Sequence, residues 1–171
     1  EATGLEVDKM DPTAVKDYFS NYLQTYKDAS GGKLGPHGIA CLLTDSYEAG
    51  AQTWTGKMME EFKARQGYDL TKWLPALTGM ILESSEQTER FLFDWRKTIG
   101  AMFVEYHYDL QNEILKPYGM KRYTESHENW RANLTDGMDC KRYADYPMSA
   151  FWMQYKQGKI FNSQFNADIH E

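Results

Sequence analysis

The chain has 171 residues, of which 42% are hydrophobic and 26% are charged, which is enough for one domain with a buried core. Its formal net charge of −6 argues against a nucleic-acid partner, because nucleic-acid-binding surfaces gather basic residues, and it suits a neutral substrate or a cation. No apolar run approaches the roughly 20 residues that cross a membrane, and two cysteines do not imply a disulfide framework.

The first predicted helix begins at Asp11-Pro12, where Asp is a good cap and Pro suits the first helical position, and Gly31-Gly32 ends it. Its expected apolar face consists of Val15, Tyr18, Phe19, Tyr22, Leu23 and Tyr26. The apolar run of residues 38–43 predicts a strand covered on both faces, with Cys41 as a small buried residue. This strand leads directly into the polar segment Thr44–Glu48.

A second amphipathic helix is predicted from Trp54, Met58, Met59 and Phe62, which recur at helical spacing. This helix is expected to end near Gly67. Residues 73–77 predict a short helical segment that ends at Gly79, with a strand at residues 80–82 as the alternative.

A long helix is predicted to begin at Ser84 or Ser85, because Gln87 stands where a capping box requires it. Apolar residues at helical spacing continue to Pro117 and Gly119, which end this helix.

Two further strands are predicted near the end of the chain. One covers residues 120–124 and is followed by the polar segment 125–128, and the other covers residues 144–152. The tail after Met153 is polar, so we expect it to be irregular.

Strands separated by helices predict an α/β fold. A complete (β/α)₈ barrel of the TIM type takes about 250 residues, whereas only about three strands are predicted here. We therefore expect residues 1–171 to be a fragment of a single catalytic barrel domain, about half of the barrel, with no second domain. Flanking sequence is expected to be missing, because about three strands make only half of a barrel. The chain begins with Glu1 rather than Met and shows no signal peptide, so we expect a processed, engineered or cropped start, from which localisation cannot be read directly.

One pentapeptide pattern occurs twice. Thr44–Glu48 (TDSYE) and Thr124–Glu128 (TESHE) share the order Thr, acid, Ser, aromatic ring, Glu, and each follows a predicted strand. All strands of a parallel barrel end on the face that holds the active site, so both segments should meet at one pocket, from opposite sides. Paired carboxylates are what glycoside hydrolysis needs, one as a protonated acid and the other for water or direct attack.

The structural alternative is that these acids cap helices or brace loops, because Asp and Ser side chains bond to nearby backbone N–H groups. Either pentapeptide alone favours that structural role. Their repetition after two strands makes catalysis an equally good interpretation.

Several other side chains are candidates near these segments. His127 is a possible substrate hydrogen-bond donor, metal ligand or general base, but a lone His is a weak metal signal and no HExxH spacing occurs. Trp54 and Trp130 follow the two acidic segments and are candidates for stacking on a sugar ring, although Trp54 is expected to pack with Met58 and Phe62. The chain has no GxSxG elbow, GxGxxG motif or P-loop.

The chain resembles the glycoside hydrolase family 106 α-L-rhamnosidases in five segments: LLTDSYEAGAQTWT, MMEEFKARQGYDLTKWLPALTG, ESSEQTERFLFDWRKTI, YTESHE and ADYPMSAFW. The similarity extends from about the first helix to Trp152. It implies the central part of a larger catalytic barrel that also carries β-rich accessory domains, in a secreted or periplasmic enzyme. The resemblance further implies removal of terminal L-rhamnose from plant polysaccharides and glycosides, inversion of the anomeric configuration, and calcium at the active site.

The resemblance matches Glu48, in TDSYEAG, to the general acid. Glu128 is preferred as the general base because of the repeat, with Glu125 as the alternative. A base on the strand end at residues 147–152 is a further alternative, but no acid follows Asp145 there. The candidate substrate-binding residues are Asp45, His127 and Trp130. Asp45 and Glu125 are weak candidates for calcium ligands, with ligands from outside this chain as the alternative.

Two other hypotheses stay open: a non-catalytic sugar-binding relative, and a barrel glycosidase of different specificity, such as a retaining galactosidase. Inverting glycosidases hold their two carboxyl groups about 6.5–9.5 Å apart and retaining ones about 5–5.5 Å, and we expect the wider gap between Glu48 and Glu128. The expected partners are a rhamnoside substrate, the rest of the barrel and accessory β domains, but neither nucleic acid nor a membrane.

Overall fold

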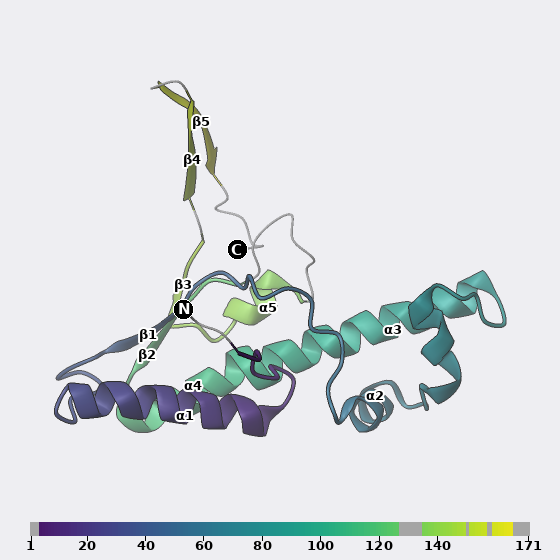
Figure 1. The fold of residues 1–171 in the computed structure, drawn as a ribbon, viewed down its shortest axis with the longest axis horizontal. Coiled ribbons are helices and arrows are strands. Elements are labelled where there is room, and N and C mark those ends of the chain that lie inside the picture. Colours follow the sequence, from purple (N-terminus) through teal and green to yellow (C-terminus); the bar gives the residue numbers. More distant parts are fainter. Residues whose placement is uncertain (1–3, 127–134, 150, 157–158, 166–171) are drawn as a thin grey trace.

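The computed structural model of the chain describes residues 4–126, 135–149, 151–156 and 159–165. Figure 1 shows a long helical rod built by α3 (Ser85–Phe103) and α4 (Leu110–Leu115). Helix α1 (Pro12–Ala29) lies beside the α4 end of the rod, and α2 (Met58–Gln66) lies beside its α3 end. A small sheet covers α1 and α4, and a two-stranded hairpin projects away from it (Figure 1). Among the described residues, no helix is long and apolar enough to span a membrane.

The start of α1 confirms its predicted cap. The Asp11 side chain accepts hydrogen bonds from the backbone N–H groups of Thr13 and Ala14. Only part of the predicted apolar face is covered, because the buried residues are Val15, Phe19 and Leu23. The tyrosines of that face, Tyr18, Tyr22 and Tyr26, are exposed and contact one another in a row.

The sheet is parallel, in the order β1-β2-β3, with β1 at Cys41–Thr44, β2 at Lys121–Thr124 and β3 at Tyr146–Pro147. Leu42 of β1 is buried, but Leu43 is 54% exposed and Cys41 is exposed too. The prediction that this strand is covered on both faces, with Cys41 buried, is therefore wrong for the described residues. An apolar run shows that a segment favours burial but does not identify which neighbours cover it.

Two apolar clusters form the main core. The first packs the sheet against α1 and α4 and consists of Val15, Phe19, Leu23, Leu42, Leu115 and Met120. The second lies around α2 and α3 and includes Met10, Tyr47, Met58, Phe62, Trp73, Phe91, Trp95 and Phe103. The two clusters together fix the rod to the sheet at one end and to α2 at the other.

The connection from α2 to α3 contains no strand. Helix α2 ends at Gly67, whose left-handed backbone suits glycine, and a 3₁₀ helix, η1, follows at Thr71–Thr78. Residues 80–82 form neither helix nor strand, so the alternative of a strand there is wrong. Trp54 lies before α2, and its ring contacts that of Trp95 at a centroid distance of 5.7 Å.

The predicted long helix begins as expected, since Ser84 Oγ accepts from the Gln87 N–H at 3.1 Å. Its winding changes along the way: the π-helix η2 (Val104–Asp109) separates α3 from α4, and the 3₁₀ helix η3 (Lys116–Tyr118) follows α4. Such changes in hydrogen-bond spacing depend on tertiary contacts, so a periodic apolar pattern does not reveal them.

A buried arginine explains how the π-helix is fixed. Arg122 of β2 has no exposed surface, and its guanidinium donates to the carbonyl groups of Tyr108 in η2 and of Cys140, the latter at 3.0 Å. Cys140 belongs to the short helix α5 (Gly137–Lys141). Burial lowers the pKa of Arg122 from its ordinary value.

The strand predicted at residues 144–152 is two separate elements. Strand β3 is short, and Phe151–Lys156 instead forms β4, which pairs antiparallel with β5 (Lys159–Phe165) in the projecting hairpin. The prediction of an irregular tail is therefore wrong where β5 lies. The α/β class is confirmed by three parallel strands joined through helical segments.

Candidate active site

The two repeated pentapeptides leave the sheet at the same edge. Thr44 and Thr124 are paired across β1 and β2, so they end equivalent strands. Because β1 and β2 are neighbours, the segments start side by side, and the expectation that they come from opposite sides of a pocket is wrong for their described parts (Figure 1).

Backbone hydrogen bonds continue the sheet beyond these threonines. The Glu125 N–H donates to the Thr44 carbonyl at 2.9 Å, and the Tyr47 N–H donates to the Ser126 carbonyl at 2.7 Å. The Thr44 hydroxyl also donates to Gln111 Oε1 at 2.8 Å, which ties this edge to α4. The backbone after each strand is therefore held in place where the acidic side chains begin.

The two acids directly after the strands have different surroundings. Glu125 is 7% exposed, and its Oε2 accepts a short hydrogen bond from the Ser46 hydroxyl. Asp45 is exposed, and its Oδ1 accepts from the Ser46 N–H at 2.9 Å. Asp45 thus braces its own turn, as the structural alternative predicted, whereas Glu125 is a buried carboxylate held by the neighbouring segment.

Glu48 is exposed on the loop that follows β1. The structure brings Asp45, Glu48 and Glu125 to one edge of the sheet, since they lie one to four residues beyond the paired threonines. The other candidates, His127, Glu128 and Trp130, lie outside the described residues. The predicted separation between the carboxyl groups of Glu48 and Glu128 therefore stays a prediction.

Tyr47 is a residue of the site whose role the sequence does not reveal, since it stands there only as the aromatic position of the repeated pentapeptide. It is 9% exposed, its hydroxyl donates to the Gly50 carbonyl at 2.8 Å, and its ring lies edge-on to Phe103. Lys9 Nζ lies 5.3 Å from the centre of the Tyr47 ring. Burial, with a smaller contribution from the Glu6 charge, raises the pKa of Tyr47. Tyr47 thus anchors the backbone next to Glu48 in the core.

A cavity of about 480 Å³ adjoins this edge of the sheet. Its lining includes Thr44 and Asp45 from the strand end, Tyr18 and Tyr22 from α1, and Lys9 from the amino-terminal segment. Aromatic faces and carboxylates together can bind a sugar, through stacking and hydrogen bonds.

Asp145 lies at the opposite end of the strands, where β2 begins. Its carboxylate accepts from Lys121 Nζ at 2.7 Å and from the Arg122 N–H at 2.9 Å, and both residues stand at the start of β2. Both bonds lower the pKa of Asp145, and the bond from Lys121 has the larger effect. A cavity of about 610 Å³ also lies at that end, away from the repeated acids. Asp145 is therefore not placed to serve as the base beside Glu48.

No group of three or more His, Cys, Asp or Glu side chains among the described residues is arranged to hold a metal ion. Calcium takes about six to eight oxygen ligands. Asp45 and Glu125 do not by themselves make such a site.

A family model and two known proteins match this chain. A family model for glycoside hydrolase family 106, described as alpha-L-rhamnosidase, matches residues 1–171. A solved structure of a rhamnosidase from Novosphingobium sp. PP1Y is 40% identical, with a TM-score of 0.82, over 93% of this chain and 15% of that one. A curated protein from Formosa agariphila, named "Putative beta-glucuronidase", is 37% identical over 149 residues, which are 87% of this chain and 12% of that protein.

Acidic side chains gather where parallel strands end, which is where α/β barrel enzymes place their active sites. The family match extends this result, because it covers all of residues 1–171: the chain belongs to glycoside hydrolase family 106, the α-L-rhamnosidases. It spans 15% and 12% of the lengths of the two relatives.

Proposed function

We propose that this chain is a section of the catalytic (β/α)₈ barrel of an enzyme that releases terminal α-L-rhamnose from plant polysaccharides or glycosides. The pairing of Thr44 with Thr124 carries the proposal, since it brings two acidic segments to one edge of a parallel sheet. Membership of the α-L-rhamnosidase family supports rhamnose as the sugar.

In this proposal Glu48 is the general acid and Glu128 is the general base, with Glu125 as the alternative base. Glu48 is exposed on the loop that follows β1, at the end of the sheet where the paired threonines stand. Glu125 is buried and already accepts a hydrogen bond from Ser46. The burial of Glu125 and its bond to Ser46 argue against Glu125 as the residue that activates water, and the repeated pentapeptide keeps Glu128 as the preferred base.

The inverting reaction uses both carboxyl groups in one step. Glu48 gives its proton to the glycosidic oxygen while the bond between that oxygen and the anomeric carbon breaks. Water attacks the same carbon from the opposite face, and the base takes the proton that the water loses. The products are β-L-rhamnose and a neutral alcohol. Asp45, His127 and Trp130 are proposed to bind the sugar, Asp45 and His127 by hydrogen bonds and Trp130 by stacking.

We propose calcium only on the strength of the family resemblance. Asp45 and Glu125 do not by themselves satisfy its usual shell of about six to eight oxygens, so carbonyl groups, water or residues outside the described ones would have to complete it. No step of the reaction above depends on the ion.

We also propose that the remaining barrel strands and accessory β domains belong to the same protein, and that it is secreted or periplasmic. The relatives support the first point, because this chain spans only 12% and 15% of their lengths. The side of the sheet that carries Leu43, Tyr123 and Tyr146 is exposed, and a closed barrel would bury that side. The sequence of the complete protein and of its amino terminus tests both points.

A β-glucuronide is a second candidate substrate, because the Formosa relative is named as a beta-glucuronidase. A glucuronide carries a carboxylate, which a cationic side chain would normally recognise. Lys9 lies beside the loop of Glu48, but it is buried and pairs with Glu6 at 2.8 Å. This pairing makes Lys9 a poor partner for the carboxylate of a glucuronide.

The test uses the intact protein and two disaccharides, one with terminal α-L-rhamnose and one with terminal β-glucuronic acid. We expect hydrolysis of the rhamnoside, its loss in Glu48→Gln, and retained rhamnoside binding by that variant in calorimetry. Hydrolysis of the glucuronide alone would replace the proposed sugar. Binding without hydrolysis by the unmodified protein would support the non-catalytic hypothesis instead.

A further inference from the structure

The loop that carries Glu48 joins β1 to α2 over residues 45–57 and contains no helix or strand. Its first residues are fixed to the neighbouring strand end by the bonds from Ser46 to Glu125 and from Tyr47 to Ser126. A general acid must be held close to the bond it protonates. The remainder of the loop therefore needs a second anchor.

That anchor is Asp8, in the segment that precedes α1. Its Oδ1 accepts from the Met10 N–H at 2.9 Å and from Gln52 Nε2, and its Oδ2 accepts from the Thr55 hydroxyl at 2.7 Å. Gln52 completes the contact, because its Oε1 accepts from the Lys9 N–H at 3.1 Å. We call this set of contacts among Asp8, Lys9, Gln52 and Thr55 the Asp8 clasp.

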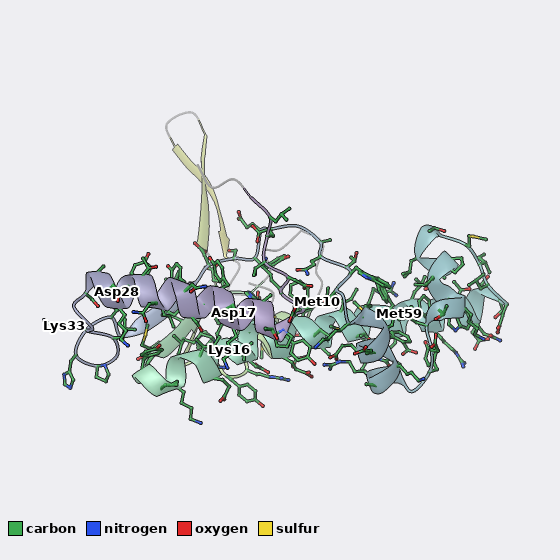
Figure 2. All side chains as sticks on the ribbon, turned by 60° about the horizontal axis from the view of Figure 1, so that its bottom comes forward. Met10, Lys16, Asp17, Asp28, Lys33 and Met59 are labelled. Atoms are coloured by element: carbon green, nitrogen blue, oxygen red, sulfur yellow. The ribbon has the colours of Figure 1, made fainter. Side chains whose placement is uncertain are left out.

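The amino-terminal side of the clasp is itself fixed in the core. Met10 is 1% exposed and belongs to the same apolar cluster as Tyr47 and Phe103. Figure 2 shows Met10 where α1 begins, beside the long helical rod. Thr55 is 5% exposed, and its carbonyl accepts from the Met58 N–H at the start of α2. The clasp thus joins two rigid parts of the molecule across the loop.

We propose that Asp8 is a positioning residue of the glycosidase reaction, which holds the loop of residues 45–57 so that Glu48 is presented to the glycosidic oxygen. This inference rests on the proposed acid role of Glu48. In this role Asp8 acts through its hydrogen bonds to the loop.

The chemistry of Asp8 suits this role. One carboxylate receives three donors, two of them from the loop and one from the backbone of its own segment. Alanine would leave Gln52, Thr55 and the Met10 N–H without this acceptor. A loop released by even about 1 Å is enough to lower turnover by about 10²-fold when it carries a catalytic group.

Asp8→Ala in the intact enzyme tests the inference, with Asp11→Ala as its matched control. Asp11 is also an acceptor at the start of α1, but it bonds to Thr13 and Ala14 and not to the loop. Each variant is assayed on a rhamnosyl disaccharide and on an activated aryl rhamnoside, which needs little protonation of its leaving group. Amide hydrogen exchange of residues 48–54 measures how firmly the loop is held.

We expect Asp8→Ala to lower turnover of the disaccharide by about 10- to 100-fold and that of the aryl rhamnoside much less, with faster exchange in the loop. Asp11→Ala removes the cap of α1 and so destabilises that helix, but it should leave the ratio of the two turnover rates and the exchange of the loop unchanged. Equal losses on both substrates in Asp8→Ala would overturn the inference, since they indicate a smaller active fraction. So would unchanged exchange in the loop.

A second pair of variants covers the case in which Asp8→Ala fails to fold. Thr55→Val keeps the shape of the side chain but removes the donor to Asp8, whereas Thr55→Ser keeps the hydroxyl. We expect the substrate-selective loss in Thr55→Val and near-normal turnover in Thr55→Ser. The reverse order would overturn the inference. If Glu48→Gln itself leaves disaccharide hydrolysis unchanged, the proposed acid role fails. A selective loss in Glu48→Gln without one in Asp8→Ala refutes the clasp alone.

Discussion

The hydroxyl of Ser46 donates a hydrogen bond to the buried carboxylate of Glu125, and these two residues come from the two repeated acidic segments. The bond ties the end of β1 to the end of β2 through side chains, beside the backbone bond from Tyr47 to Ser126. A buried carboxylate is costly unless it accepts hydrogen bonds. Ser46, the serine of the first repeated segment, thus stabilises the fold through its bond to Glu125.

Ser46→Ala should loosen this edge of the sheet. Removal of a donor from a buried acceptor costs about 1–3 kcal/mol, so the free energy of local opening at β1 and β2 should fall by that amount. Native-state hydrogen exchange of the amides in Leu42 to Thr44 and Arg122 to Thr124 measures it. Ser20→Ala, on the exposed side of α1, is the control and should stay within about 0.5 kcal/mol. Equal protection in Ser46→Ala and Ser20→Ala would contradict the assigned role of the bond.

Glu48→Gln should remove proton donation but keep the shape of the side chain. We expect turnover of a rhamnosyl disaccharide to fall by about 10² to 10⁴, because general acid catalysis contributes a factor of that size. An activated aryl rhamnoside should lose much less. The ratio of the two rates is the measurement, and Glu60→Gln, on exposed α2 surface, is the control. An equal loss on both substrates would count against Glu48 as the acid.

The repeated pentapeptides were enough to predict that two strand ends meet, because residues that follow parallel strands gather at one edge whatever the remaining fold. Helix α1 was predictable from Asp11-Pro12 and Gly31-Gly32, since caps and breakers act locally. Periodicity also located α3, but not the π-helix inside the rod, which Arg122 of β2 helps to fix from a distant part of the chain.

Long-range contacts account for what the sequence left hidden. Asp8 meets Gln52 and Thr55 across 44 and 47 positions, and side-chain bonds of this kind leave no repeating pattern. The exposure of Cys41 and Leu43 depends on which elements cover the sheet, not on the strand's own residues. For the same reason β3 and β4 could not be separated within residues 144–152, where one predicted strand is divided between two different pairings.

Asp145 should make the start of β2 more stable at neutral pH than in acid. Lys121 and the Arg122 N–H lower the pKa of Asp145 in the folded protein, so its ionised form is favoured by folding. The stabilisation is complete above the unfolded value of about 3.9 and disappears as the pH falls through the lower folded value. It should be small, because the side chain is 32% exposed and solvent screens the pair.

Exchange protection of the Arg122 amide, corrected for its intrinsic pH dependence, measures this effect between neutral pH and about pH 3. In Asp145→Asn the protection of the Arg122 amide should be lower at neutral pH. It should then decrease little further as the pH falls to about 3. Asp17→Asn, on α1 (Figure 2), provides the control and should leave the profile unchanged. A profile that keeps its full acid-dependent fall in Asp145→Asn would assign the effect to another carboxylate.

The stereochemistry of the product tests the pairing of carboxyl groups. Glu48 lies four residues beyond Thr44, as Glu128 does beyond Thr124, and those threonines end neighbouring strands. The resemblance to inverting family 106 enzymes, and not the position of the strand ends, leads us to predict a separation in the inverting range of about 6.5–9.5 Å, which leaves room for a water molecule between base and sugar. Proton NMR of the first-formed sugar should then show β-L-rhamnose from an α-linked substrate. Initial α-L-rhamnose would instead require a gap of about 5–5.5 Å and a covalent intermediate.

Comparison of two variants identifies the base in the same assay. If Glu128 activates the water, Glu128→Gln should lower turnover on the disaccharide and on the aryl rhamnoside alike, because both reactions need the attacking water. Glu125→Gln should lower turnover less, since a glutamine oxygen can still accept the hydrogen bond from Ser46. The opposite ranking would make the buried Glu125 the base and would place the reacting water next to Ser46. Equal, small effects of both substitutions would mean that the base lies on another strand.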